Sequence, residues 1–167
     1  MGYAYALAGR LTKAVELAEA AVAEGDSMQL LGGRSLLLGY AGEVYLLAGR
    51  LDEARQSGQR ALVSATEQME RGYEGWALRL LAETALRSAP SDCTHAADFA
   101  RRALVIAQEL GMRPLAAHAH SLLGRSLEVV GDVESARSHL AAAVALLERM
   151  NMSRWLGPAR DSRERLT

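Results

Sequence analysis

The stretches "GYAYALAGRLTKAVELAEAAV" (2–22) and "GEVYLLAGRLDEARQSGQRAL" (42–62) share glycines, a tyrosine and two alanines at a separation of 40 residues. A third copy is "GRSLEVVGDVESARSHLAAAV" (124–144), and a weaker one is "AETALRSAPSDCTHAADFARRAL" (82–104). The second alanine of each copy falls at 21, 61, 103 and 143, so the steps are 40, 42 and 40 residues. Four copies in one register indicate a repeated structural unit.

Each copy predicts a tight antiparallel helical hairpin. An apolar stretch ends at a glycine such as Gly9, Gly49 or Gly131, and glycine is favoured just past a helix end because positive φ costs it little. We expect a polar residue to cap the helix that follows, the candidates being Thr12, Asp52 and Asp132. The two alanines of each copy are seven residues apart, which is about two turns, so they share one face and let the paired helix approach closely.

The composition supports an all-α fold and excludes several classes of protein. Half of the 167 residues are apolar but only 5% are aromatic, and Ala and Leu, which favour helices, dominate. The net charge is −1, which gives no reason to expect binding to nucleic acid or to a membrane surface. The single cysteine excludes an internal disulfide framework. No apolar run is long enough for a membrane span and no signal peptide is evident, so we expect a cytoplasmic chain.

The spacing Gly-x2-Tyr-x3-Gly followed by Ala-x6-Ala resembles the tetratricopeptide repeat (TPR), over residues 1 to about 150. The resemblance implies hairpins stacked into a right-handed superhelix (an α-solenoid) that binds a protein or peptide. Two features depart from the family pattern. The tryptophan at the head of each unit is absent from most copies, with Trp76 only near that place, and the period is 40 residues rather than about 34.

The longer period is similar to the C-terminal helical arrays of large bacterial signalling ATPases of the MalT and LuxR kind, and of TPR-bearing adenylate and guanylate cyclases. In such proteins the array is a sensory or assembly module. No phosphate-binding string G-x4-G-K-[ST] occurs here. Because Gly2 already stands in mid-helix register, we expect a domain fragment, and a naturally short protein is the alternative.

The breaks in the pattern predict eight helices and a C-terminal cap. The expected helices are 1–8, 11–24, 28–48, 52–69, 72–89, 93–110, 113–130 and 133–150. They form four hairpins over residues 1–150, the first of them truncated, and residues 151–167 form a capping segment and tail. In that segment we expect Trp155 and Leu156 to fold onto the last hairpin and a short helix to begin at Pro158.

The residues that could suggest catalysis have simpler explanations. His118 and His120 point about 200° apart on a helix, so they do not readily bind one metal. Cys93 and His95 lack a third orienting group, and we expect Cys93 to be an ordinary loop cysteine. The glycines at 32, 33, 39 and 42 match no phosphate-binding string and suggest close helix packing. We therefore expect no enzyme activity, no metal and no cofactor.

A partner is expected to bind in the concave groove lined by the first helix of each hairpin. The TPR resemblance implies the positions Leu36, Gly39, Glu43, Leu46, Trp76, Arg79, Glu83, Leu86, His118, Ser121, Arg125 and Glu128. A buried aromatic residue beside an arginine is typical of an interaction hot spot. The alternative is that Glu83 and Arg125 pair across adjacent helices and that Trp76 belongs partly to the core.

Two functions from different classes are compatible with this pattern. One is a protein-interaction or scaffold module of a larger signalling or transcription-regulatory protein, with a peptide or protein segment in the groove. The other is self-association as a homodimer, through the edge that a truncated first hairpin leaves uncovered.

Overall fold

The computed structural model describes residues 1–30, 32–89 and 92–166, and in these residues it contains helices and no strand. The helices are α1 (Gly2–Leu7), α2 (Leu11–Ser27), α3 (Arg34–Leu47), α4 (Leu51–Glu67), α5 (Arg71–Ser88), α6 (Cys93–Glu109), α7 (Arg113–Val129), α8 (Val133–Arg149) and α9 (Ser153–Glu164). Among them, none has both the length and the hydropathy that crossing a membrane requires.

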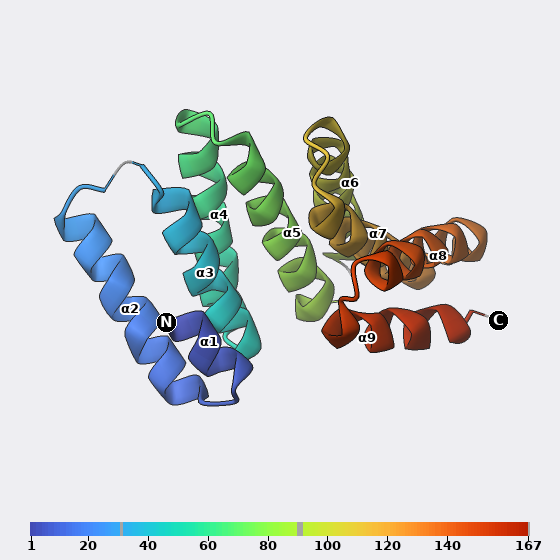
Figure 1. The fold of residues 1–167 in the computed structure, drawn as a ribbon, viewed down its shortest axis with the longest axis horizontal. Coiled ribbons are helices and arrows are strands. Elements are labelled where there is room, and N and C mark those ends of the chain that lie inside the picture. The colour runs from blue at the N-terminus through green and yellow to red at the C-terminus, as the bar shows by residue number, and fades with distance from the viewer. Residues whose placement is uncertain (31, 90–91, 167) are drawn as a thin grey trace.

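The helices form a helical-repeat, solenoid-like array. Each helix packs against the next along the chain, and the described part runs across the view in chain order from α2 to α8 (Figure 1). In addition α1 packs against α3, α3 against α5, and α5 against α7. The odd-numbered helices α1 to α7 therefore make an inner layer, and α2, α4, α6 and α8 make an outer layer. The all-α class expected from the sequence is confirmed.

The repeated small residues lie where the two helices of a hairpin cross. The first alanine of every copy is completely buried, and so is the second alanine of the last three copies; Ala21 alone is partly exposed (Ala14, Ala54, Ala96, Ala136, Ala61, Ala103, Ala143). At Gly124, a Cβ atom would lie 3.1 Å from the carbonyl oxygen of Ala136 on the next helix. The backbones are thus close enough that small residues are required at the crossing, and Gly124 itself leaves no room for a Cβ atom.

The turns follow the predicted glycine pattern, whereas only one of the predicted caps forms. Gly9, Gly49 and Gly131 all have positive φ, between 75° and 85°. The Asp132 carboxylate accepts a hydrogen bond from the Ser135 amide at 3.1 Å. This residue directly follows its glycine and occupies the N-cap position. Thr12 and Asp52 follow theirs by three residues, already inside the first turn, and they make no cap.

The structure corrects two helix boundaries. Helix α3 begins at Arg34 rather than at residue 28, because Gly33 adopts a left-handed conformation with φ of 77° immediately before it. The last helix begins at Ser153 rather than at Pro158, and the proline lies inside it. Leu156 and Ala159 pack against residues of α7 and α8, and this tertiary packing offsets the hydrogen bond that the proline removes.

The connection between α5 and α6 departs from the glycine turns. The sequence of this connection predicts that Pro90 stops the first helix and that Ser91 or Asp92 caps the second, but Pro90 and Ser91 lie outside the described residues. Asp92 stands at the N-cap of α6 without a side-chain hydrogen bond to the helix. Cys93 is the first residue of α6, where the expected helix 93–110 also begins, and its side chain is only 2% exposed, so it is a buried helical residue rather than an ordinary loop cysteine.

Candidate functional site

A cavity of about 490 Å³ lies along the inner layer of helices. Its walls come from α1, α3, α5, α7, the turn before α9, and α9 itself. We call it the aromatic cavity, and the residues that line it are Tyr3, Ser35, Leu36, Gly39, Tyr40, Glu43, Tyr73, Trp76, Ala77, Arg79, His118, Met152 and Trp155. A volume between about 300 and 1,000 Å³ is usual for a ligand pocket.

Aromatic side chains are concentrated in this cavity. The chain has two Trp, five Tyr and one Phe, all in its described part, and both tryptophans and three tyrosines line the cavity. Several of them face solvent, since Tyr40 is 50% exposed and Tyr73 and Trp155 are each 37% exposed. In a chain so poor in aromatic residues, this much ring surface open to solvent in one place makes the cavity the candidate site.

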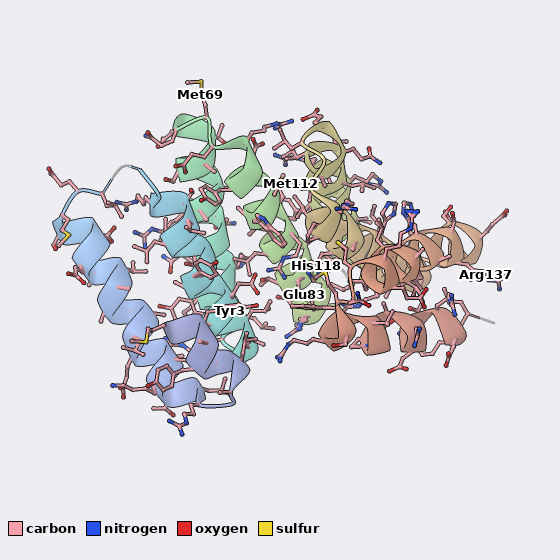
Figure 2. The ribbon with its side chains drawn as sticks, in the orientation of Figure 1. Tyr3, Met69, Glu83, Met112, His118 and Arg137 are labelled. Carbon is pink, nitrogen blue, oxygen red and sulfur yellow. The ribbon has the colours of Figure 1, made fainter. Side chains whose placement is uncertain are left out.

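The rings contact each other in two groups. The His118 ring on α7 lies 5.8 Å from the ring of Trp76 on α5 and 5.3 Å from that of Trp155 on α9, edge-to-face in both cases. The rings of Tyr3 and Tyr40 lie 5.6 Å apart and join α1 to α3. Figure 2 shows Tyr3 and His118 near the middle of the molecule. Edge-to-face contacts stabilise such pairs by about 0.5–1.5 kcal/mol beyond the area they bury, which fixes the walls of the cavity.

The charged groups of the cavity compensate one another. Arg79 forms an ion pair with Glu43 on the neighbouring helix, and its guanidinium carbon lies 5.8 Å from the centre of the Trp76 ring. His118 is neutral at pH 7, because burial, assisted by the charge of Arg79, lowers its pKa to about 4. The cavity therefore holds one cation and one anion, paired.

A second cluster occupies the other half of α5. The Glu83 carboxylate accepts hydrogen bonds from Arg87 at 2.7 Å and from Arg125 of α7 at 2.8 Å. We call these three residues the Glu83 cluster. Burial alone would raise the pKa of Glu83, but the two guanidinium groups hold it below its usual value. The cluster uses its charges internally, as an ionic connection between two inner helices.

The structure separates the predicted groove positions into two sets. Six of them line the aromatic cavity: Leu36, Gly39, Glu43, Trp76, Arg79 and His118. The other six lie elsewhere: Leu46, Glu83, Leu86, Ser121, Arg125 and Glu128. Glu83 and Arg125 pair with each other, as the alternative stated, and Glu128 contacts Arg165 of the segment after α9 at 3.4 Å.

Two leucines in the second set belong to the hydrophobic interior. Leu46 is 3% exposed and packs with Ala54 and Leu80, so it is a core residue rather than a contact for a partner. Leu86 packs against the cluster of buried residues that contains Ala82 and Leu123. Both lie in the last turns of their helices, beyond the end of the cavity.

Some cavity residues missed by the repeat positions follow from helical geometry. Tyr40 lies four residues after Leu36, and Tyr73 lies three residues before Trp76, so each shares a face with a predicted position. Tyr3, Met152 and Trp155 have no such signal. Trp155 is brought to the cavity by α9, which lies outside the repeat.

His118 and His120 contact different parts of the structure. His118 lines the cavity, whereas the Nδ1 atom of His120 lies 2.9 Å from that of His139 on α8. Burial lowers the pKa values of both His120 and His139. Within residues 1–30, 32–89 and 92–166, no three His, Cys, Asp or Glu side chains are grouped so that they could hold a metal ion.

Comparison with known proteins adds no family. A scan against protein-family models gives no match for this chain, and a search of curated protein sequences gives none either. The candidate function is therefore argued from the aromatic cavity itself.

Proposed function

We propose that this chain is a non-catalytic protein-interaction module that binds a peptide or protein segment in the aromatic cavity. The observation that carries the proposal is the convergence of five aromatic side chains from α1, α3, α5 and α9 on one cavity of about 490 Å³. Trp, Tyr and Arg are the residue types that dominate the energy of protein interfaces, and the cavity supplies all three. The resemblance to the tetratricopeptide repeat, a module that binds segments on its inner helices, favours the same use.

The chemistry of the cavity favours binding over catalysis. Glu43 and Arg79 neutralise each other, and the ring of His118 stands between two indole rings. A general base needs a free lone pair within hydrogen-bond reach of the substrate proton. Here the Glu43 carboxylate is held by Arg79, and a pKa of about 4 makes His118 a weak base at neutral pH. A place for the module in a bacterial signalling protein of the cytoplasm is part of the same proposal and rests on the resemblance alone.

The test uses segments selected from a random peptide display on the whole chain. Binding of the selected peptides is measured for the wild type, Tyr40→Ala and Tyr73→Ala. Both tyrosines are at least one-third exposed, so these substitutions should leave the fold intact. We expect binding to weaken at least about tenfold, the loss that one hot-spot side chain contributes.

The matched control is Val105→Ala on α6. Val105 is 50% exposed and does not line the aromatic cavity. We expect this variant to bind the selected peptides as the wild type does. If peptides bind equally well to all four proteins, the cavity is not the binding site and the proposal is wrong.

Self-association as a homodimer is the second candidate, and one observation favours it. Val129, Val130 and Val133 around the α7–α8 turn are 53%, 53% and 43% exposed, which leaves a small apolar tip on the surface. Analytical ultracentrifugation at micromolar concentration separates the two candidates. A monomer would exclude the homodimer, and a dimer that Val130→Asp dissociates would support it.

A further inference from the structure

The aromatic cavity has no net charge to offer a ligand. Glu43 and Arg79 are the charged residues that line it within the described chain, and they pair with each other. A charged group that entered would lose its hydration and would find both charges already paired, with only the Nε donor of Arg79 left without a hydrogen-bond partner, which is unfavourable in a partly enclosed site. This argues against a carboxylate or an ammonium group as the main occupant.

A cation is disfavoured for a second reason. Aromatic walls can attract a cation to their faces, but here the guanidinium of Arg79 already lies 5.8 Å from the centre of the Trp76 ring. The cavity therefore contains its own cation. A second one would be repelled by Arg79 and would compete with it for Glu43.

The walls are suited to another ring. The ring of His118 contacts the rings of Trp76 and Trp155 edge-to-face, and the ring of Tyr40 contacts that of Tyr3 at 5.6 Å. About half of Tyr40 and more than a third of Tyr73 face solvent. Aromatic pairs gain stabilisation beyond that of the apolar area they bury, which an aliphatic group does not supply.

We infer that the aromatic cavity takes an uncharged aromatic ring, presented by the bound segment as a Phe, Tyr or Trp side chain. The inference rests on the proposed function, because it names the anchor residue of the segment. Arg79 and Glu43 then set specificity by excluding charged side chains, while the indole and phenol rings hold the anchor.

The experiment follows the two indole N–H signals of the 15N-labelled chain by NMR. The chain has two tryptophans, and both line the cavity, so each indole signal reports on it directly. The probes are N-acetyl amides of phenylalanine, cyclohexylalanine, arginine and glutamate. Cyclohexylalanine is the matched control, because it has the same carbon skeleton as phenylalanine without the aromatic electrons.

We expect the phenylalanine amide to shift both indole signals saturably. Its dissociation constant should be at least threefold lower than that of the cyclohexylalanine amide, and at least tenfold lower than those of the arginine and glutamate amides. Equal binding of the first two would overturn the preference for an aromatic ring. Equal or tighter binding of either charged amide would overturn the preference for an uncharged one.

The Glu43→Gln variant tests the charge argument separately. It keeps the shape of the side chain but leaves Arg79 without its carboxylate partner. We expect the glutamate amide to bind this variant at least tenfold more tightly than it binds the wild type, with the dispersion of the NMR spectrum confirming the fold. An unchanged affinity for the glutamate amide would show that the ion pair does not set specificity.

Two further comparisons separate this inference from the proposed function. If selected peptides require the cavity tyrosines but anchor through a charged residue, the inference is wrong and the proposed function stands. If p-cresol binds as tightly as peptides that carry tyrosine, the ligand is a free aromatic compound. A bound peptide segment would then be wrong both in this inference and in the proposed function.

Discussion

The two halves of α5 both carry charged side chains, but these side chains have different surroundings. In the first half, Trp76 and Arg79 border a cavity that is open to solvent. In the second half, Glu83 is 9% exposed and is enclosed by Arg87 and Arg125. The difference lies in what each charge meets. Trp76 and Arg79 line a cavity together with rings from other helices, whereas the carboxylate of Glu83 is taken up by two arginines.

Among the substitutions considered, one in the Glu83 cluster should lower the free energy of unfolding the most. We expect Glu83→Ala to lower the free energy of unfolding by about 2 kcal/mol, because two partly exposed guanidinium groups lose the charged hydrogen bonds to their carboxylate. Urea denaturation followed by circular dichroism measures the change. Arg87→Ala is the control, and since Arg87 is 44% exposed we expect a loss below about 1 kcal/mol. Similar losses for both variants would show that the cluster behaves as an ordinary surface ion pair.

His118 lines the aromatic cavity and should make stability depend on pH. Its pKa is lowered to about 4 by burial, with Arg79 lowering it further and Glu83 raising it. As the pH falls below the ordinary value of about 6.5, the unfolded chain binds this proton first, so stability is lost between pH 6.5 and 4 and is fully present above that window.

The measurement compares the wild type with His118→Phe, which keeps a ring but does not titrate. Between pH 7 and pH 5 we expect the wild type to lose about 2 kcal/mol more of its free energy of unfolding than the variant does. His120 and His139 also have lowered pKa values, but they are present in both proteins and cancel. Parallel losses in the two proteins would contradict the assignment.

Two glycines on the inner helices distinguish the cavity wall from the crossing of α7 and α8. A Cβ atom on Gly39, in the cavity wall, would meet nothing within 4 Å, whereas one on Gly124 would lie 2.5 Å from Cγ of Leu140. We expect Gly39→Ala to raise stability by up to about 1 kcal/mol through helix propensity while narrowing the cavity. Gly124→Ala should lower stability by roughly 1–2 kcal/mol through overpacking. Thermal unfolding measures the melting temperature of both variants. Shifts of the two melting temperatures in the same direction would refute the difference between the two glycines.

The smallest effect is expected for the ion pair between Glu128, near the C-terminal end of α7, and Arg165. Glu128 lies 3.4 Å from Arg165, whose side chain is 57% exposed. We expect Glu128→Ala to change the free energy of unfolding by less than about 0.5 kcal/mol, since such pairs gain little in water. A loss comparable to that of Glu83→Ala, measured by the same urea titration, would mean that exposure does not separate the two ion pairs.

The fold could be predicted from the sequence because its rules are short-range. A glycine follows the first helix of three of the four hairpins and an alanine pair marks each crossing, and both signals act within one hairpin. The six-residue correction at the start of α3 comes from Gly33, whose left-handed conformation the apolar pattern did not reveal. The start of α9 was missed because packing of Leu156 and Ala159 outweighs the local signal of Pro158.

The candidate site was only partly predictable, because position in a repeat does not decide what a side chain meets. Trp76 and Glu83 both occupy inner positions by the family pattern, yet one lines a cavity and the other is paired with two arginines. Tyr3 and Trp155 come from opposite ends of the sequence. Their approach depends on the accumulated rotation from hairpin to hairpin, which no local pattern encodes.

The meeting of Tyr3 and Trp155 on one cavity has an evolutionary consequence. Repeat arrays ordinarily gain and lose whole units by duplication and unequal recombination, since each unit contacts only its neighbours. Here one more hairpin inserted between α4 and α5 would carry the wall made by α1 away from the wall made by α9. The array could still fold, but its cavity would be divided, so selection for the cavity would hold the number of hairpins constant.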